Sequence, residues 1–381
     1  MYPNRPVWAE VDLQVILDNL RRVRERIGPA VRLMAVVKSD AYGHGKLEVV
    51  EKIHRWCDWL GVSFIDEGVE LRQAGYDLPI LCLVSPLPDE LDAVIKYGLT
   101  PTVSDLAIVR ALSERLEHWG WDAANAPPRE VHLKVDTGMG RLGVWHAQAA
   151  GTAAAIAALP GVKLGGLMTH FPLADGADKS FTREQIRRFD AVVDELRGRG
   201  LGPGLRHAAN TAAALDIPES RYDMVRPGLA LYGSYPSEHV DRSVGLQNAL
   251  TLRARLAVVK RLPAGTTISY GRRYRLERET TVGVLPVGYA DGWRRSLTGR
   301  AEVIFRGRRR PIIGVICMDM CLIDLENCPN ARPGEVVTLL GRDYSGEVIR
   351  VEEAAGWMET IPYEVTCALS ERVPRHYLGS R

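Results

Sequence analysis

Residues 33–45 read Leu33-Met-Ala-Val-Val-Lys-Ser-Asp-Ala-Tyr-Gly-His-Gly45, an apolar run that ends in a lysine and a glycine-containing turn. A short apolar run of this kind, in a chain where such runs alternate with segments of helical periodicity, predicts a strand of a βα unit. The alternation continues to about residue 235. The strands that we expect cover residues 33–37, 59–64, 80–84, 100–103, 130–135, 163–169, 205–208 and 223–226.

The order of these elements predicts the architecture. Strands that alternate with helices are parallel, and about eight such units in this length favour a closed (β/α)8 TIM barrel. An open, doubly wound sheet is the structural alternative. It usually carries a glycine-rich fingerprint after its first strand, and this sequence has none. The expected helices cover residues 12–27, 66–74, 89–97, 104–119, 147–159, 179–199 and 211–215.

The pattern changes after about residue 236. Short strand-like runs follow one another with turn signals between them, which is typical of a mostly β domain. We therefore expect an α/β protein with a barrel at residues 1–235 and a mostly β domain at residues 236–381. Within the second domain only residues 351–357 have a helical pattern. The expected strands there cover residues 252–261, 280–285, 301–305, 311–316, 321–325 and 335–340.

Composition excludes several classes of partner. The 381 residues include 49 Lys and Arg and 47 Asp and Glu, a formal net charge of +2. This balance gives no electrostatic reason to expect binding to nucleic acid or to an anionic membrane. The chain has neither a signal-peptide stretch nor an apolar run that could span a bilayer, so we expect a cytoplasmic protein. The six cysteines lack the spacing of a zinc site, and we expect free thiols and no metal.

Polar groups recur where the expected strands end, and barrel enzymes place their sites at these ends. Lys38 follows the first expected barrel strand; burial there would lower its pKa, and a neutral amine suits Schiff-base chemistry. A lone lysine at a strand end more often packs its stem and extends its amine to solvent. The following turn favours a site, because two glycines permit close approach of a ligand and Tyr42 offers a hydroxyl.

A second group of candidates follows the last expected strands. Asn210 and Thr211 open a helix, where a hydroxyl and free backbone amides would together face an anion such as phosphate. The alternative is that Asn210 is a simple helix cap. Arg226 and Gly228 follow the last strand, and barrels often bind phosphate at this point. His170 is either a hydrogen-bonded structural residue or a group that packs against a planar ring.

These segments, in this order, resemble those of bacterial alanine racemases, which depend on pyridoxal phosphate and belong to fold type III. The resemblance extends over nearly the whole chain. Its motifs lie at residues 35–45, 133–143, 169–171, 207–210, 268–271, 287–292, 317–320 and 361–365. Departures are few: Thr211 stands where serine is common, and Val315 where arginine is common.

The resemblance implies an enzyme that interconverts L-alanine and D-alanine by a two-base mechanism and supplies D-alanine for peptidoglycan. It implies a homodimer with composite active sites, in which Tyr270 and Met318 come from the partner subunit. A serine racemase or a broad-specificity amino-acid racemase of the same family is the alternative. A pyridoxal-phosphate decarboxylase is a weaker one, since such enzymes usually place an acidic group, not an arginine, at the pyridine nitrogen.

The resemblance also implies residue roles. Lys38 would hold pyridoxal 5'-phosphate and act as one catalytic base, and Tyr270 would be the other. Lys134 is similar to a lysine that is carbamylated in many members, and Arg141 and Met318 would contact the substrate. The remaining cofactor-binding residues would be Tyr42, His170, Asn210, Thr211, Arg226, Gly228, Leu229 and Tyr363.

Overall fold

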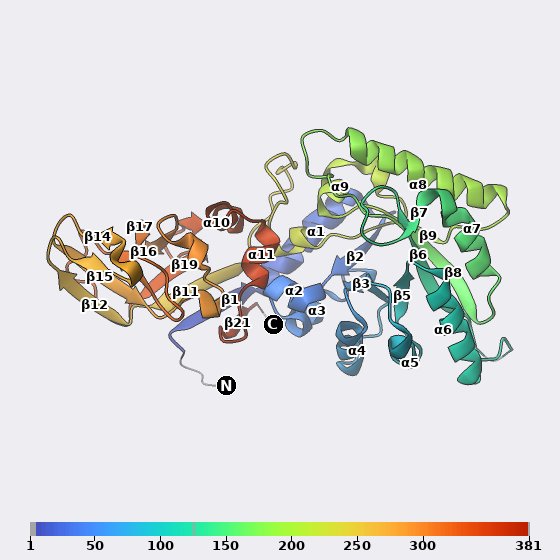
Figure 1. Cartoon of the computed structure of the whole chain (residues 1–381), viewed down its shortest axis with the longest axis horizontal. Helices are drawn as coiled ribbons and strands as arrows, with labels where there is room; N and C mark the ends of the chain where they lie inside the picture. Colours follow the sequence, from blue (N-terminus) through green and yellow to red (C-terminus); the bar gives the residue numbers. More distant parts are fainter. Residues whose placement is uncertain (1–4, 125, 380–381) are drawn as a thin grey trace.

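A computed structural model describes residues 5–124 and 126–379. Figure 1 shows two parts along the long axis of the molecule, a barrel wrapped by helices and a β domain beside it. Buried apolar side chains of both parts belong to one continuous core. The two parts are therefore packed together and not joined by a free linker.

The barrel is a parallel sheet with the strand order β10-β2-β3-β4-β5-β6-β8-β9. Backbone hydrogen bonds from Asp223 to Arg206 (3.1 Å) and from Arg226 to Ala209 (2.9 Å) join its first and last strands. The expected (β/α)8 barrel is thus confirmed, although several strands end earlier than expected. The eight strands are β2 (Arg32–Val36), β3 (Trp59–Val62), β4 (Ile80–Cys82), β5 (Thr100–Val103), β6 (Arg129–Asp136), β8 (Val162–Met168), β9 (Leu205–His207) and β10 (Met224–Val225). The short strand β7 (Val144–Trp145) pairs with β6 outside this order.

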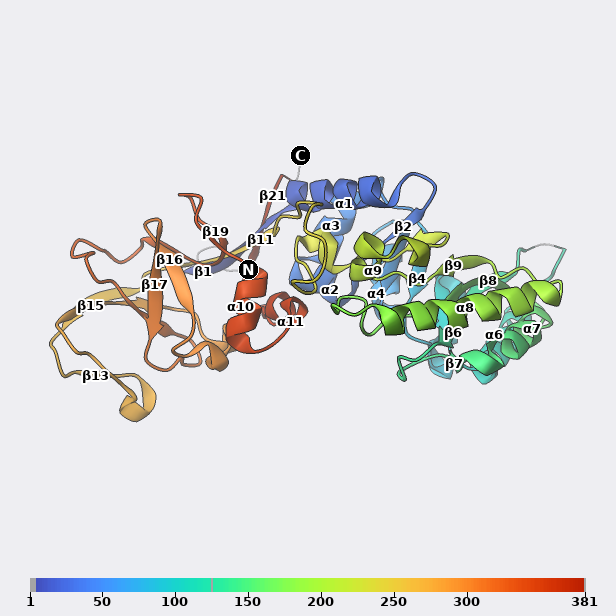
Figure 2. The ribbon, with the colours of Figure 1, turned by 90° about the horizontal axis from the view of Figure 1, so that it is seen from above.

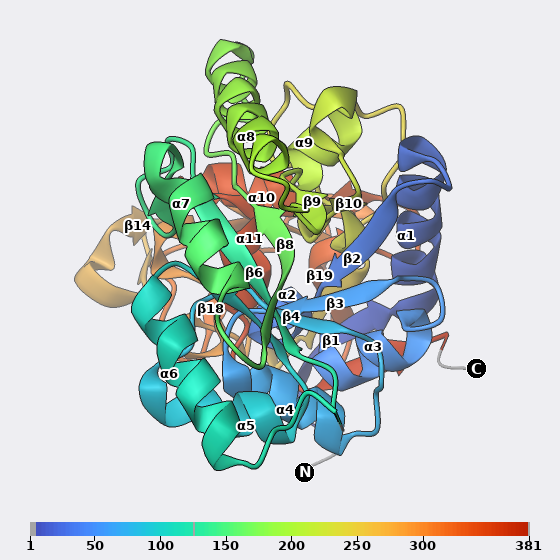
Figure 3. The ribbon, with the colours of Figure 1, turned by 90° about the vertical axis from the view of Figure 1, so that its right-hand side faces the viewer.

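Helices surround the barrel strands, as the view in Figure 3 shows. The first helix illustrates why they form. The Asp12 carboxylate accepts hydrogen bonds from the amides of Gln14 and Val15, and the helix buries Ile16 and Leu20 at helical spacing. The helices are α1 (Leu13–Ile27), α2 (Lys38–Gly43), α3 (Lys46–Ile53), α4 (Ile65–Gln73), α5 (Leu91–Lys96), α6 (Leu106–His118), α7 (His146–Ala157), α8 (Ser180–Gly198) and α9 (Thr211–Asp216).

The second domain is built on a sheet with the order β12-β15-β18-β17-β16-β19-β11-β1-β21, and β20 pairs with β19. The prediction of a mostly β domain is confirmed. It also contains α10 (Val351–Met358) and α11 (Pro362–Cys367). The expectation of a single helix was wrong, because α11 is too short to show a helical period. The strands are β11 (Leu250–Arg255), β12 (Val258–Leu262), β13 (Thr267–Ile268), β14 (Tyr274–Arg275), β15 (Thr280–Leu285), β16 (Glu302–Phe305), β17 (Arg308–Ile313), β18 (Cys321–Asp324), β19 (Val336–Arg342), β20 (Val348–Ile349) and β21 (Arg375–Leu378).

The first strand of the chain, β1 (Val7–Asp12), belongs to this second sheet and not to the barrel. It pairs antiparallel with β11 and parallel with β21. The local sequence pattern does not predict this strand, since its partners come from the far end of the chain. The domain boundary near residue 235 stays a prediction. Although β1 lies within residues 1–235, it pairs with strands of the β domain.

Candidate active site

A cavity of about 630 Å³ opens at the carboxyl ends of the barrel strands. Every predicted site residue of the barrel lines it, and so does Tyr363, which α11 of the β domain contributes. The structure therefore brings together side chains that lie more than three hundred residues apart in sequence. The predicted residues in the lining are Lys38, Tyr42, Lys134, Arg141, His170, Asn210, Thr211, Arg226, Gly228, Leu229 and Tyr363.

Lys38 and Tyr42 reach the cavity through an unusual turn. The residues from Ser39 to Tyr42 have φ values of 51–55° and lie in the left-handed region, although none is glycine. This conformation costs about 1–2 kcal/mol per residue, so surrounding groups must hold it. The Glu67 carboxylate accepts a hydrogen bond from the Ser39 amide (2.6 Å), and the Asp40 carboxylate accepts one from the Lys46 amide (2.7 Å).

The cavity is rich in cationic side chains. Burial and the neighbouring Arg141 lower the pKa of Lys38, against the opposing effect of Glu67 and Cys367. Burial, then Arg226, Arg141 and Lys38, lower the pKa of Lys134 to about 8. Asp175 is the one acidic side chain in the lining formed by the described residues. A cavity with this charge favours an anionic ligand, and the lowered pKa of Lys38 favours the neutral, nucleophilic form of its amine.

Hydroxyl and amide groups converge at one end of the cavity. The Thr211 hydroxyl oxygen accepts hydrogen bonds from the amides of Gly228 (3.1 Å) and Ala230 (3.4 Å). A Cβ atom on Gly228 would lie 2.3 Å from the Tyr42 hydroxyl oxygen, so only glycine fits beside this tyrosine. Asn210 caps α9 by accepting from the Ala213 amide (3.2 Å). Asn210 thus lines the cavity and also has the capping role that was its alternative.

Arg226 is fixed by a buried network. It donates to the carbonyl oxygens of Thr169 (2.7 Å) and Ala208 (3.1 Å) and to Nδ1 of His207 (3.1 Å). Because arginine has no acceptor, His207 carries its proton on Nε2 and donates it to Nδ1 of His132 (2.8 Å). Burial, followed by Arg226, lowers the pKa of both histidines, so both are neutral and Arg226 keeps the charge.

The loop that carries Arg141 is shaped by a carboxylate and by glycines. Asp136, at the end of β6, accepts hydrogen bonds from the amides of Gly138 and Met139, each at 2.9 Å. Gly138 has a φ of 137°, and a Cβ atom there would lie 2.8 Å from the ring of Phe181. The Asp-Thr-Gly-Met-Gly-Arg motif therefore builds a fixed loop, with an exposed Arg141 at the mouth of the cavity.

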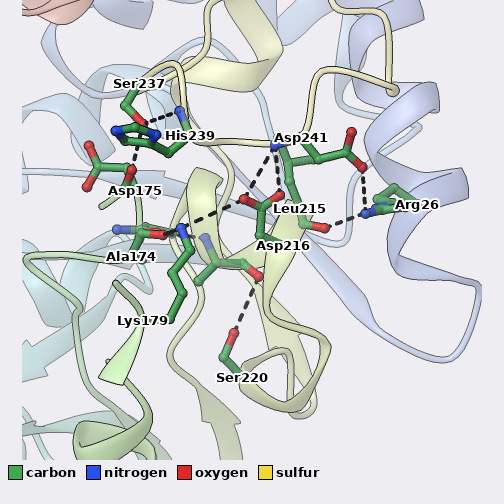
Figure 4. Close-up of polar contacts among 12 residues, drawn as sticks. Arg26, Ala174, Asp175, Lys179, Leu215, Asp216, Ser220, Ser237, His239 and Asp241 are labelled. Carbon is green, nitrogen blue, oxygen red and sulfur yellow. Dashed lines mark hydrogen bonds and ion pairs between the residues drawn. The ribbon is translucent and has the colours of Figure 1, made fainter. Parts of the chain in front are cut away.

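The chain that leaves the barrel contributes Pro236 to the cavity lining and packs against the loop that bears Asp175, as the contacts in Figure 4 show. The Ser237 hydroxyl donates to the carbonyl oxygen of Asp175 (2.6 Å), and the Asp241 amide donates to Asp216 (3.1 Å). Arg26 of α1 pairs with Asp241 at 2.9 Å. These contacts fix the segment that bears Asp175. Burial, followed by this carboxylate, raises the pKa of Tyr363 to about 12.

Comparison with known proteins decides the family. The models described as "Alanine racemase, N-terminal domain" and "Alanine racemase, C-terminal domain" match residues 11–236 and 249–377. The chain belongs to the alanine racemase family. It is 43% identical over 379 residues to the alanine racemase of Symbiobacterium thermophilum, with 98% of each chain covered. It is 40% identical over 377 residues to that of Desulforamulus reducens, with 98% of this chain and 99% of the relative covered.

Solved structures agree with this assignment. Alanine racemase from Clostridium difficile has a TM-score of 0.92 at 32% identity and covers 99% of this chain and 96% of its own. The Bacillus anthracis alanine racemase with bound L-Ala-P has a TM-score of 0.89 at 33% identity, with the same two coverages. The expectation of an amino-acid racemase with this fold is therefore confirmed, and the serine and broad-specificity alternatives are not favoured.

Two predicted site residues of this alanine racemase family member do not line the cavity. The side chains of Tyr270 and Met318 are 71% and 53% exposed on the β domain. Figure 2 places β13, which ends two residues before Tyr270, at the end of the β domain remote from the barrel. Within one chain the phenol and Lys38 are thus in separate places.

Other residues of the site have roles that the sequence does not predict. His132 looks like an isolated histidine in an apolar strand, and His207 belongs to a recognised motif that predicts no role for it. In the fold, His207 contacts Arg226 directly, and its 2.8 Å contact with His132 extends this network. Asp175 lies in a loop without a distinctive motif.

No helix within the described residues combines the length and the apolar character needed to cross a membrane.

Proposed function

We propose that this protein interconverts L-alanine and D-alanine, with pyridoxal 5'-phosphate as cofactor. One catalytic base would be Lys38, and the other would be Tyr270 of the partner subunit. The observation that carries the proposal is the position of Lys38. Its amine, with a lowered pKa, shares a cationic cavity with a cluster of hydroxyl and amide groups suited to phosphate. The names of the relatives support alanine as the substrate.

The residues present fit the proposed cofactor. The phosphate would bind to Tyr42, Thr211, Gly228, Leu229 and Tyr363, where Gly228 leaves no room for a Cβ atom. Lys38 would hold the aldehyde carbon, Arg226 would face the pyridine nitrogen and His170 would pack against the ring. When bound, this cofactor withdraws electrons from the substrate and makes its Cα proton acidic.

Two bases are needed for the proton transfer. A single group cannot reach both faces of a planar centre, so one must remove the proton and another must return it on the opposite face. Lys38 would serve one face, and the exposed Tyr270, remote from its own cavity, would serve the other face in a neighbouring chain. This arrangement requires a homodimer in which each subunit completes the site of the other. Arg141 of the same chain as Lys38, together with Met318 of the partner subunit, would hold the substrate.

Product analysis tests the function. The purified protein is supplied with pyridoxal phosphate and then with L-alanine, L-serine or L-lysine, and the enantiomers are separated by chiral chromatography. We expect D-alanine to form fastest. Serine or lysine as the best substrate would favour the broader alternative. The absence of D-alanine from a preparation with bound cofactor would contradict the proposal. A peptidoglycan role and a cytoplasmic location stay predictions.

Arg226 is expected to suppress a side reaction. Burial lowers its pKa to about 9, so the guanidinium stays protonated at neutral pH and donates a hydrogen bond without transferring its proton. With Arg226 at the pyridine nitrogen, the bound cofactor would be a weaker electron sink than with a carboxylic acid there. We predict that Arg226→Glu increases transamination relative to racemisation, measured as pyruvate per D-alanine. More transamination with the native arginine would contradict this role.

Lys134 is expected to be carbamylated. Its amine, with a pKa near 8, is partly neutral at physiological pH and can attack the carbon of carbon dioxide, forming a carbamate and releasing a proton. The new negative charge would lie among Arg141, Arg226 and Lys38, where a second ammonium group would be repelled. We predict a carbamate signal in the 13C NMR spectrum with labelled bicarbonate that weakens as pH falls below about 8. The same signal in Lys134→Ala would contradict the assignment.

A further inference from the structure

Ser269, the residue before Tyr270, has a strained backbone. Its φ of 62° and ψ of −176° lie in a region that essentially only glycine occupies. It follows β13 directly and precedes the short 3-10 helix η4 (Tyr270–Arg272). A residue with a side chain stays in this conformation only when its surroundings hold it, and such residues concentrate at functional sites.

The serine hydroxyl ties this backbone to the body of the β domain. It donates to the carbonyl oxygen of Val315 (2.5 Å) and lies 3.6 Å from the Cys317 sulfur. Gly314 makes room for the contact, because a Cβ atom there would lie 2.9 Å from the Ser269 Cβ. The segment that receives the hydroxyl continues into Met318, so one side chain links the two loops that carry Tyr270 and Met318.

The Tyr270 phenol has no hydrogen-bond partner among residues 5–124 and 126–379. Arg272 donates from its amide to the Ser269 carbonyl oxygen (3.3 Å) and from Nε to the Thr267 hydroxyl (2.8 Å), which closes the loop on itself. Tyr270 is 71% exposed, and among the described residues its hydroxyl makes no hydrogen bond and its ring stacks on no other ring. The strained backbone of Ser269 therefore sets the direction of a side chain that is mostly exposed.

We propose that Ser269 is a positioning residue for Tyr270. Its anchored hydroxyl holds the strained backbone, which aims the phenol outward before the partner subunit is engaged. The inference rests on the proposed function, in which Tyr270 transfers a proton at the partner's site. A displacement of about 1 Å in a catalytic group can cost ~100-fold in rate, so an aim fixed in the single chain has a direct catalytic value.

Two substitutions separate the effect of the Ser269 hydrogen bond from the effect of the backbone strain. Ser269→Ala removes the hydrogen bond and keeps a Cβ atom in the strained region. Ser269→Gly removes the bond but permits the backbone conformation, and therefore folds even if the alanine variant does not. Both variants free the loop. We expect each to lower kcat by about ten-fold or more, through misplacement of the base, and to change KM less than about two-fold.

A displaced Tyr270 has an isotopic signature. Each enantiomer is incubated in D2O, and deuterium at Cα of the recovered starting enantiomer is compared with inversion. For the enantiomer whose proton Lys38 removes, exchange continues while return from the other face slows, so the exchange-to-inversion ratio rises about ten-fold. For the other enantiomer it does not rise. Partial misfolding would lower both rates together and leave both ratios unchanged.

Controls distinguish the inference from the proposed function. Tyr270→Phe gives the change in kcat and in the exchange ratio when the second base is lost completely. Ser345→Ala is the matched control, because it removes a hydroxyl from another turn of the same domain. Trypsin cleavage after the exposed Arg272 and Arg273 gives a readout that needs no activity, and we expect it to be faster in both Ser269 variants. Native exchange ratios and native cleavage rates in these variants would overturn the role of Ser269. A fully active Tyr270→Phe would instead overturn the proposed function.

Discussion

Lys38→Ala loses racemase activity by at least about 10⁴-fold, because the substitution removes both the amine that holds the cofactor and one of the two bases. Burial, followed by Arg141, lowers the pKa of Lys38, which favours the neutral form of the amine that a nucleophile needs. Borohydride reduction followed by mass spectrometry tests whether the cofactor is covalently attached to Lys38. The native protein should gain one cofactor at Lys38, and the variant should gain none.

A matched control uses a lysine of the same barrel. Lys163 is exposed on β8, pairs with Glu130 at 2.8 Å and does not line the cavity. Lys163→Ala should keep native activity and should still be labelled at Lys38, because surface ion pairs contribute little to stability. Labelling of Lys38→Ala at an equal level would show that another lysine holds the cofactor.

Gly228→Ala weakens cofactor binding by about 10- to 100-fold. The new Cβ atom would lie 2.3 Å from the Tyr42 hydroxyl oxygen, and the packed tyrosine has to move away from the phosphate site. Loss of one hydrogen bond to a charged group costs about 1.5–3 kcal/mol, which corresponds to this range. Equilibrium dialysis against pyridoxal phosphate measures the effect.

Gly151→Ala is the control for this substitution. Gly151 lies within α7 and has nothing within 4 Å of the position of its Cβ atom, so alanine should fit and support the helix. Native affinity in Gly228→Ala would mean that Gly228 and Tyr42 do not form the phosphate site, whatever the activity of the protein.

The sequence predicts the barrel well because each βα unit carries its own periodic signal. It does not predict β1 in the second sheet, since β11 and β21 lie more than two hundred residues away. The left-handed turn after Lys38 is also hidden, because no glycine marks residues 39–42 and the hydrogen bonds that hold it come from elsewhere in the fold.

The candidate site was likewise predictable only in part. Lys38, Thr211 and Arg226 follow strands, and parallel strands bring their carboxyl ends together, so their grouping in one cavity was predictable. The neutral state of His132 and His207 was not predictable, because it depends on a hydrogen-bond chain across the barrel interior. The pairing of Lys38 with Tyr270 depends on two chains, and periodicity within one chain carries no signal of it.

Complementation between two inactive variants tests the central claim most directly. Lys38→Ala and Tyr270→Ala homodimers are mixed, dissociated and reassociated, so that up to about half of the dimers are mixed and each of these contains one site with both native residues. We predict that activity recovers to about one quarter of the native value per site in the mixture. No recovery at any mixing ratio, with mixed dimers shown by mass spectrometry, would contradict a site shared between subunits.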